Sequence, residues 1–431
     1  MNGSPRERNG ARLEDLLVAT ADRYPARPAM VDAWGSLSWR DLAAGVERAR
    51  AGLAAAGLRP GEVVALSLPN GAAFVSAFLA VASLDGVALP LHPDTNQAEA
   101  EDALARARAR WRVAREEEEG ACPDGPRFLR YSDLLRRGSS PILRGEGDPG
   151  RTAILLLASG STGRPRLIPR THANLVAESR QFAGALRVLP EDAILAAVSL
   201  QHARGLGHCL LASLGTGAKL VLAEGSEHAR TVEAIRRERV TLLPGPTAQF
   251  AALAGTPGIA TADLASVRVA FSAGAPLAPG VFEGFLGRFG IPVRRLFGCS
   301  EAGSVSIDLD PNPSRTAGSV GRPMEGVGVE VRRPDGSRCG AGVSGEIAIR
   351  GPALSPGYLG DAERNVRQFR RGWFFPGDLG WFDGEGRLWI EGRTTSFADA
   401  SGKEALARNG LRSLLRKDLS TPTEGTSAPA A

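Results

Sequence analysis

Cysteine and long apolar runs are both scarce in this sequence. The four cysteines, Cys122, Cys209, Cys299 and Cys339, lie far apart and show no CxxC spacing. This argues against a structural zinc site or a disulfide framework and favours a reducing compartment. Glycine, proline and charged residues break the apolar stretches well before about 18 residues, and residues 1–11 lack an apolar core of signal-peptide length. We therefore expect a soluble, cytoplasmic protein without a membrane span.

Lysine and blocks of like charge are also rare. The 52 basic and 47 acidic residues give a net charge of +5 but are interspersed, and the one run of note, residues 116–119, is acidic and typical of a solvated loop or helix end. The charge pattern therefore does not indicate a nucleic-acid partner. Only three basic residues are lysines, namely Lys219, Lys403 and Lys417, so a reaction that needs a lysine has three candidates.

Apolar material, by contrast, is ample for a large core. The 431 residues are 43% hydrophobic, which is ordinary globular composition. At roughly 100 to 200 residues per domain, a chain of this length forms two to four compact units. A single small binding module is therefore excluded.

Helical and strand-like segments alternate up to about residue 300. Residues 41–57 have helical periodicity and end in a glycine, and the apolar run 63–68 follows a Pro-Gly turn. Further short strands are expected at 153–157, 194–198, 220–222, 240–243 and 267–271. Short apolar strands separated by helices predict mostly parallel sheets that helices cover on both faces, which is an α/β fold of the doubly wound kind.

The pattern changes after about residue 305 to short strands punctuated by Gly and Asp-Gly pairs. Examples are 327–331, 346–350 and 388–391, with Asp-Gly turns at 335–336 and 383–384. Such segments predict antiparallel hairpins. Residues 419–431 contain almost nothing to bury, so we expect them to be disordered.

The strongest local signal is a turn of small residues directly after the expected strand 154–157. The turn consists of Ser159, Gly160, Ser161, Thr162 and Gly163. The two glycines let the backbone approach a ligand closely, and the three hydroxyls lie beside backbone N–H groups, which suits phosphate oxygens. The turn lacks the GxxxxGK[ST] pattern of a Walker loop, and on its own such a turn is structural more often than functional.

Further segments follow this turn in a defined order. They are RTHAN (170–174), QHARGL (201–206), SAGAP (272–276), FGCSE (297–301), GE (345–346), GY (357–358), GD (377–378) and GR (392–393). In this order the sequence resembles the acyl- and aryl-CoA synthetases and adenylation domains of the adenylate-forming superfamily, which activate carboxylic acids with ATP. The resemblance extends from about Leu13 to Arg393 and covers the large N-terminal domain of that family.

The resemblance implies a definite domain organisation. Two doubly wound α/β subdomains are expected over 12–304, a smaller β-rich subdomain of the distorted-barrel kind over 305–393, and a truncated hinge region with a disordered tail over 394–431. In the family, a mobile C-terminal domain with a catalytic lysine follows the hinge. The stretch after Arg393 is too short for that domain, so we expect a separate domain or partner chain to supply it.

The family's nucleotide contacts map onto several residues of this chain. Residues 159–163 would hold the β- and γ-phosphates, and Phe297 would stack on adenine beside the backbone of Gly274 and Ala275. Asp378 would accept hydrogen bonds from the ribose hydroxyls, and Arg393 would lie near ribose and phosphate. The alternatives are a core phenylalanine at 297, a turn aspartate at 378 and an ordinary surface arginine at 393.

The resemblance also implies catalytic roles. Ser300 would touch the α-phosphate and Glu301 would hold Mg²⁺, a hard cation that prefers oxygen ligands. Thr162 and Arg166 are expected to act with Glu301 in catalysis, although Arg166 stands where the family commonly has lysine. Arg166 keeps the positive charge, so we expect this departure to cost little. The absent C-terminal lysine matters more, since loss of one electrostatic donor lowers rates by about 10²- to 10³-fold.

His202 is the candidate for the acid pocket, and Gly298 is a second candidate on the substrate side. The alternative for His202 is a histidine buried in the core. Activators of α-amino acids place an aspartate in this segment to pair with the ammonium group. Residues 199–203 contain no acidic side chain, which favours a fatty, aryl or other non-amino carboxylic acid.

Three functions remain open at this point. The first is an enzyme that forms an acyl-adenylate from ATP and a small carboxylic acid, followed by transfer to CoA or a phosphopantetheinyl carrier protein. The second is a paralogue that binds ATP or acyl-adenylate without turnover. The third is a catalyst of acyl transfer alone that never uses ATP.

Overall fold

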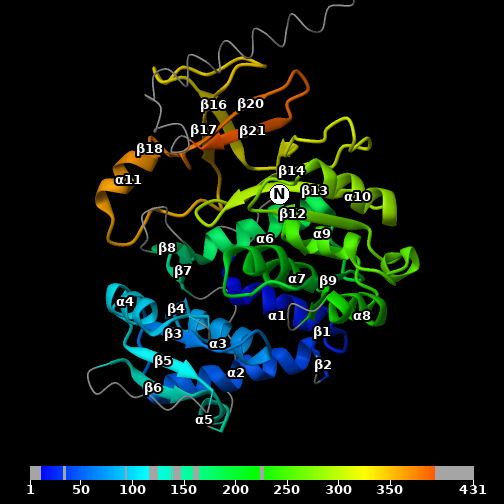
Figure 1. The fold of residues 1–431 in the computed structure, drawn as a ribbon. Helices are drawn as coiled ribbons and strands as arrows, with labels where there is room; N and C mark the ends of the chain where they lie inside the picture. The colour runs from blue at the N-terminus through cyan, green and yellow to red at the C-terminus, as the bar shows by residue number, and fades with distance from the viewer. Residues whose placement is uncertain are drawn as a thin grey trace, which may run out of the picture.

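The computed structural model describes residues 11–32, 35–92, 95–115, 125–136, 138, 147–158, 165–223 and 228–393. These residues form three sheets, and helices surround two of them (Figure 1). The turn 159–163, Cys122, Lys403 and Lys417 lie outside the described residues. No helix within the described residues is long and apolar enough to cross a membrane.

The largest sheet has nine strands in the described part of the chain. In order across the sheet they are β15 (Arg322–Pro323), β14 (Gly303–Ile307), β13 (Val293–Cys299), β12 (Val269–Ala273), β11 (Leu242–Gly245), β9 (Ala193–Ala196), β10 (Lys219–Leu222), β1 (Pro28–Val31) and β2 (Ser36–Ser38). The strands from β13 to β1 run parallel, and antiparallel strands close both edges. This confirms the predicted parallel arrangement.

A second sheet has six strands, again as far as the chain is described. Their order is β6 (Arg127–Arg130), β5 (Trp111–Ala114), β3 (Val63–Ser67), β4 (Val87–Pro90), β7 (Thr152–Ala158) and β8 (Arg166–Thr171). All neighbours are parallel except β7 and β8, which pair antiparallel. This pairing brings Ala158 opposite Arg166, so that the two ends of the undescribed turn lie side by side.

Helices separate and cover the two parallel sheets, as Figure 1 shows. Between the sheets lie α1 (Leu13–Arg23), α2 (Trp39–Ala56), α3 (Ala72–Ser83), α6 (His172–Leu186), a π-helix (Gly205–Leu211) and α7 (Ala212–Thr216), whose apolar faces form the main core. The outer face of the nine-stranded sheet is covered by α8 (His228–Glu238), α9 (Thr247–Gly255), a 3₁₀ turn (Thr261–Leu264) and α10 (Pro279–Phe289). The other outer face carries α4 (Gln97–Ala107), and α5 (Tyr131–Leu134) packs at the edge beside α2. The predicted α/β fold is therefore confirmed.

Helix α2 illustrates how local sequence sets these elements. The Ser38 hydroxyl accepts from the N–H of Asp41 and satisfies one free donor of the first turn. Gly57 ends the helix at a φ of 93°, a left-handed conformation that glycine adopts without strain. The helix predicted at 41–57 is thus observed with an earlier start.

The third sheet is antiparallel and lies above the nine-stranded sheet in the view of Figure 1. It contains β18 (Phe369–Arg370), β19 (Trp373–Phe374), β17 (Gly345–Arg350), β20 (Asp378–Phe382) and β21 (Leu388–Arg393) in this order, with β16 (Gly328–Arg332) also pairing with β17. Helix α11 (Ala362–Gln368) precedes β18. The predicted hairpins are observed. The expected domain boundary at residue 304 falls within β14, and the division into domains stays a prediction.

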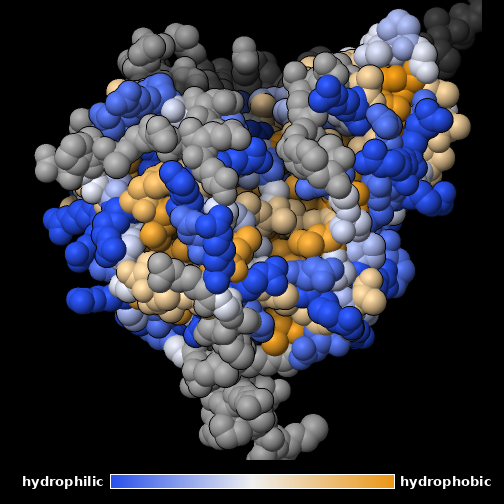
Figure 2. Space-filling view, turned by 90° about the horizontal axis from the view of Figure 1, so that it is seen from below, coloured by the Kyte–Doolittle hydropathy of each residue, from blue (hydrophilic) through white to orange (hydrophobic). Residues whose placement is uncertain are grey.

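On the face shown in Figure 2, hydrophilic side chains alternate with smaller hydrophobic areas. This agrees with the interspersed charges of the sequence. The cysteines at positions 209, 299 and 339 carry free thiols.

Candidate active site

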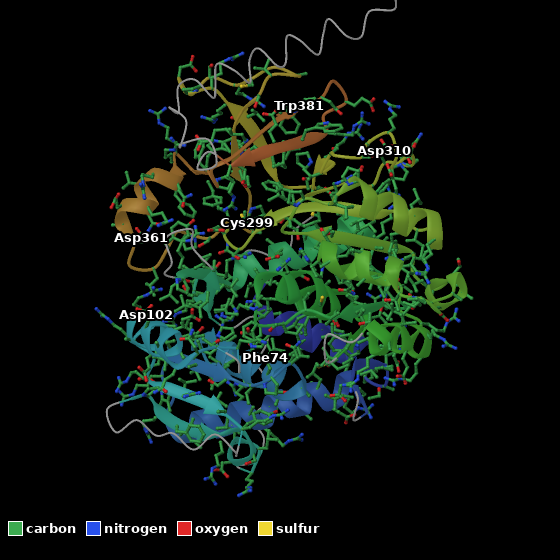
Figure 3. All side chains as sticks on the ribbon, viewed as in Figure 1. Phe74, Asp102, Cys299, Asp310, Asp361 and Trp381 are labelled. Carbon is green, nitrogen blue, oxygen red and sulfur yellow. The ribbon has the colours of Figure 1, made fainter. Side chains whose placement is uncertain are left out.

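A cavity of about 430 Å³ opens where several strands end. Its wall includes the carboxyl ends of β7, β12 and β13, which is where open α/β sheets bind their ligands. The predicted site residues in its wall are Arg166, His202, Gly274, Gly298, Ser300, Glu301 and Arg393. Cys299, also in the wall, lies between the antiparallel sheet and helix α6 (Figure 3). The fold thus gathers residues that are more than two hundred positions apart in the sequence.

Glu301 is fixed by contacts from two other segments. Its side chain is only 7% exposed, and its Oε1 accepts hydrogen bonds from the Tyr358 hydroxyl at 2.7 Å and from Arg166 Nη1 at 3.2 Å. Arg166 is the first residue of β8, and its Nη1 also lies 3.0 Å from the Tyr358 hydroxyl. The N–H of Ser355 donates to the Glu301 carbonyl at 2.7 Å. The carboxylate is therefore held in one orientation at the cavity.

Asp378 and Arg393 face each other across the β20–β21 pair. Arg393 Nε donates to Asp378 Oδ1 at 3.0 Å, and Asp378 is buried whereas the Arg393 side chain is 61% exposed. Burial raises the pKa of Asp378, the charge of Arg393 opposes this shift, and the charge of Glu301 adds to it. Arg393 lines the cavity, whereas Asp378 is not part of its wall and reaches it only through its contact with Arg393.

The residues expected around adenine are only partly gathered. Gly274 lines the cavity with a φ of 86°, but Ala275 and Phe297 do not belong to its wall. Phe297 is half-buried and packs against the main core. Its stacking role stays a prediction, and so does the phosphate role of residues 159–163, whose flanking residues Leu157, Ala158 and Arg166 reach the cavity.

His202 lies exposed in the cavity wall and is not a core histidine. Its ring stacks on that of His92, with centroids 6.2 Å apart and an interplanar angle of 4°. Loss of hydration in the cleft lowers the pKa of His202, and the charges of His92 and Arg204 lower it further. The imidazole is therefore neutral at physiological pH, and it can accept or donate a hydrogen bond.

A buried ion pair beneath the cavity was not anticipated from the sequence. Arg170 Nη2 donates to Glu178 Oε2 at 2.8 Å, and both side chains are almost completely buried. Arg170 Nη1 also donates to the carbonyl of Ser300 at 2.9 Å. Gly207 leaves room for the carboxylate, since a Cβ there would lie 2.1 Å from Glu178 Oε1. The pair thus ties β8 and α6 to the turn that carries Ser300.

The described residues contain no group of three or more His, Cys, Asp or Glu side chains that could hold a metal ion. A magnesium ion that is bound mainly through phosphate oxygens needs only one or two protein carboxylates. Glu301 fits this requirement, because its carboxylate is oriented at the cavity wall. Lys219, the one lysine among the described residues, pairs with Glu238 at 2.8 Å and is not part of this wall.

The structure combines an α/β fold with a cavity at the carboxyl ends of its strands, and comparison with known proteins identifies the family. The AMP-binding enzyme family model matches residues 17–359, and the chain belongs to this family. The predicted membership of the adenylate-forming superfamily and the ligase type of enzyme are thereby confirmed.

Several curated relatives are CoA ligases. The chain is 29% identical to a feruloyl-CoA synthase of Amycolatopsis sp. over 394 residues, which cover 90% of this chain and 79% of the relative. It is 29% identical to an oxalate–CoA ligase of Arabidopsis thaliana, with 91% and 81% covered, and 28% identical to an indoleacetate–CoA ligase of Aromatoleum aromaticum, with 89% and 77% covered.

Solved structures show the same fold. O-succinylbenzoate coenzyme A synthetase (MenE) of Bacillus subtilis, in complex with AMP, superposes with a TM-score of 0.78 at 26% identity and covers 88% of this chain and 98% of that chain. The N-terminal domain of FACL13 from Mycobacterium tuberculosis has a TM-score of 0.81 at 22% identity, with 89% and 100% covered.

Proposed function

We propose that this protein activates a non-amino carboxylic acid with ATP and then forms its CoA thioester. In the first step a carboxylate oxygen bonds to the α-phosphorus of ATP while the bond to pyrophosphate breaks, which gives an acyl-adenylate. In the second step the thiolate sulfur of CoA bonds to the acyl carbon and AMP leaves. The observation that carries this proposal is the convergence of Arg166, Glu301 and Arg393 on one cavity at the carboxyl ends of the strands.

The residues of the cavity suit the first step. The carboxylate of Asp378 can accept from both ribose hydroxyls, and Arg393 beside it would lie near ribose and phosphate. Ser300 lies in the wall next to Glu301, which would hold magnesium. The ion neutralises phosphate charge when bound, and Arg166 supplies a further positive charge near Glu301.

The choice of a non-amino acid has two supports. No acidic side chain occurs in residues 199–203, next to the exposed His202, so that segment offers an ammonium group no counter-ion. The relatives reported above are named for feruloyl, oxalate and indoleacetate thioesters, none of which carries an α-amino group. If His202 lines the acid pocket, His202→Ala changes the ranking of acids. A loss of stability with an unchanged ranking would contradict this role.

Carboxylate-dependent exchange between ATP and pyrophosphate tests the proposal, together with calorimetry of ATP and Mg²⁺. We expect ATP binding and exchange that depends on an added acid, followed by a CoA-dependent release of AMP. Absence of ATP binding by the wild-type protein would overturn the proposal. ATP binding without exchange under any condition would favour a paralogue that holds nucleotide without turnover.

Two finer points stay predictions and have their own tests. A separate C-terminal domain added in trans should accelerate the exchange, and equal rates with and without it would contradict the need for a partner. A phosphopantetheinyl carrier protein is the alternative thiol acceptor. Loading of the acid onto a carrier in competition with CoA distinguishes the two acceptors.

A further inference from the structure

The charges in the cavity wall are balanced at every described position except one. The balanced pairs are Arg166 with Glu301 at 3.2 Å, Glu178 with Arg170 at 2.8 Å and Arg393 with Asp378 at 3.0 Å. Arg204 also lines the cavity, and no carboxylate of the described residues lies within ion-pair distance of its guanidinium group. The described wall therefore carries one uncompensated positive charge, located at Arg204.

The main chain holds this guanidinium group at the cavity. Arg204 directly precedes the π-helix, its side chain is exposed, and its Nη1 donates to the carbonyl of Ala273 at 2.9 Å. It packs against Gly274, where a Cβ would lie 2.9 Å from Nη1. One edge of the guanidinium group is thus fixed at the end of β12, while the side chain remains accessible from the cavity.

The nearest titratable neighbours do not neutralise Arg204. Burial lowers the pKa of both His202 and His208, that of His208 to about 3, and the charge of Arg204 lowers both further. Both imidazoles are therefore neutral near pH 7. His208 is fixed in the wall by ring contacts to Phe182 and Phe271. A neutral, partly enclosed surrounding makes the single cation a strong site for an anion.

Arg204 has different neighbours in the cavity wall from Glu301. Its Nη1 donates to the carbonyl of Ala273 at the end of β12, and its charge acts on His202. Glu301, in contrast, contacts Arg166 and Tyr358, and its charge acts on Asp378. The group around Glu301 is the one that suits phosphate, ribose and magnesium. An anion at Arg204 would therefore be part of the acid at a distance from the reacting carboxylate.

We infer that Arg204 binds a second negatively charged group on the acid, so that the substrate class is dicarboxylic acids. This inference rests on the proposed function, because it takes the cavity as the acid pocket. The planar guanidinium group can donate two parallel hydrogen bonds to a carboxylate. A monoacid of the same length, which lacks the second carboxylate, leaves the positive charge of Arg204 unpaired. A charged hydrogen bond of this kind corresponds to about 10- to 100-fold in affinity.

Calorimetry with matched pairs of acids tests this inference. The protein is first titrated with α,β-methylene-ATP and Mg²⁺, and then with succinate against butanoate, glutarate against pentanoate, adipate against hexanoate, and terephthalate against benzoate. We expect at least one diacid to bind about 10- to 100-fold more tightly than its matched monoacid. Arg204→Met should abolish this preference without changing the affinity for the nucleotide analogue, and Arg204→Lys should retain part of it. Arg237→Met, on the exposed surface of α8, is the matched control and should leave the preference intact.

Each other outcome overturns the inference. If no diacid is preferred by the wild type, Arg204 does not select a second charge. If Arg204→Met weakens the binding of the diacid and of its matched monoacid equally, the arginine binds the reacting carboxylate. If the substitution weakens the binding of the nucleotide analogue, the arginine binds the nucleotide. Failure of the wild type to bind the analogue contradicts the proposed function instead, and the acid pairs are then compared on the nucleotide-free protein.

Discussion

The two ends of the cavity balance their charges differently. At the end formed by β8, the turn after β13 and the β20–β21 pair, every described charge has an opposite charge beside it. At the end that carries His202 and Arg204, His202 and His208 are neutral near pH 7, and Arg204 has no carboxylate partner among the described residues. Under the proposed function, the first end would exchange its internal partners for phosphate, ribose and magnesium. The second end would take a negative charge from the ligand.

This difference separates common chemistry from specificity. The nucleotide and the reacting carboxylate are the same for every acid that is activated with ATP. The paired end therefore needs the same groups whatever the acid is. In the proposal, the unpaired end would meet the part of the acid that varies, and its positive charge would discriminate against acids that leave that charge unpaired. The comparison can be tested by removing one partner of a pair at a time.

The largest effect is expected for Glu178→Ala, which leaves Arg170 buried without a counter-ion. Both side chains are almost fully buried, so the variant should lose about 3 to 5 kcal/mol of unfolding free energy in urea. Glu233→Ala is the matched control, since Glu233 forms an exposed pair with Arg237 on α8 and its loss should cost at most about 0.5 kcal/mol. Equal losses in the two variants would show that the buried pair is not special. Glu178→Leu with Arg170→Met should recover much of the stability.

The next largest effect concerns catalysis. Glu301→Gln keeps the shape of the side chain and a contact for the Tyr358 hydroxyl, but it removes the charge that would hold magnesium. We expect the exchange rate to fall by about 10²- to 10³-fold, together with loss of the magnesium dependence of ATP binding. Tyr358→Phe removes one hydrogen bond to Glu301 and keeps its charge, so about a tenfold loss or less is expected. A larger loss in the tyrosine variant would mean that orientation of the carboxylate, not its charge, is decisive.

The paired end was also the more predictable end. Glu301, Asp378 and Arg393 stand in short segments that a resemblance can identify, and the structure brings them to one place. Glu178 stands in no such segment, and Arg204 lies within the segment 201–206 but receives no role from the resemblance. A charged residue on a helix that is otherwise apolar looks the same whether it is paired inside the core or aimed at a ligand, because the partner comes from another part of the chain.

Local patterns and long-range pairing also differ in the fold itself. The caps and periodicity of α2 are local, so its place in the sequence could be predicted. Strands β1 and β2 join the nine-stranded sheet through β10, which follows much later in the chain, and no local pattern specifies that choice. The π-helix from Gly205 to Leu211 is another example, because Gly207 leaves room for Glu178 of α6, whose Oε1 would lie 2.1 Å from a Cβ at Gly207.

The smallest expected effect is a pH dependence at the paired end. Burial raises the pKa of Asp378 above its ordinary value of 3.8, so the folded protein holds this proton more tightly than the unfolded chain. Its contribution to stability is therefore fully present below the ordinary pKa and is lost as the pH rises through the raised pKa. The ionised form is the one that accepts from the ribose hydroxyls, so ATP affinity should weaken as the pH falls through that same raised pKa.

Asp378→Asn separates these two effects, because it removes the titration and keeps the size of the side chain. Relative to the wild type, the variant should gain stability as the pH rises from below 3.8, measured by urea unfolding across a pH series. Near neutral pH the variant should bind ATP more weakly than the wild type, and its ATP affinity should lack the pH dependence that comes from Asp378. The wild type and the variant should bind 2′,3′-dideoxy-ATP with the same affinity. A stability difference that does not change with pH would contradict the raised pKa. If the variant still binds ATP more tightly than dideoxy-ATP, the ribose contact of Asp378 is contradicted but its raised pKa is not. The charge pair with Arg393 would then be the main role of Asp378.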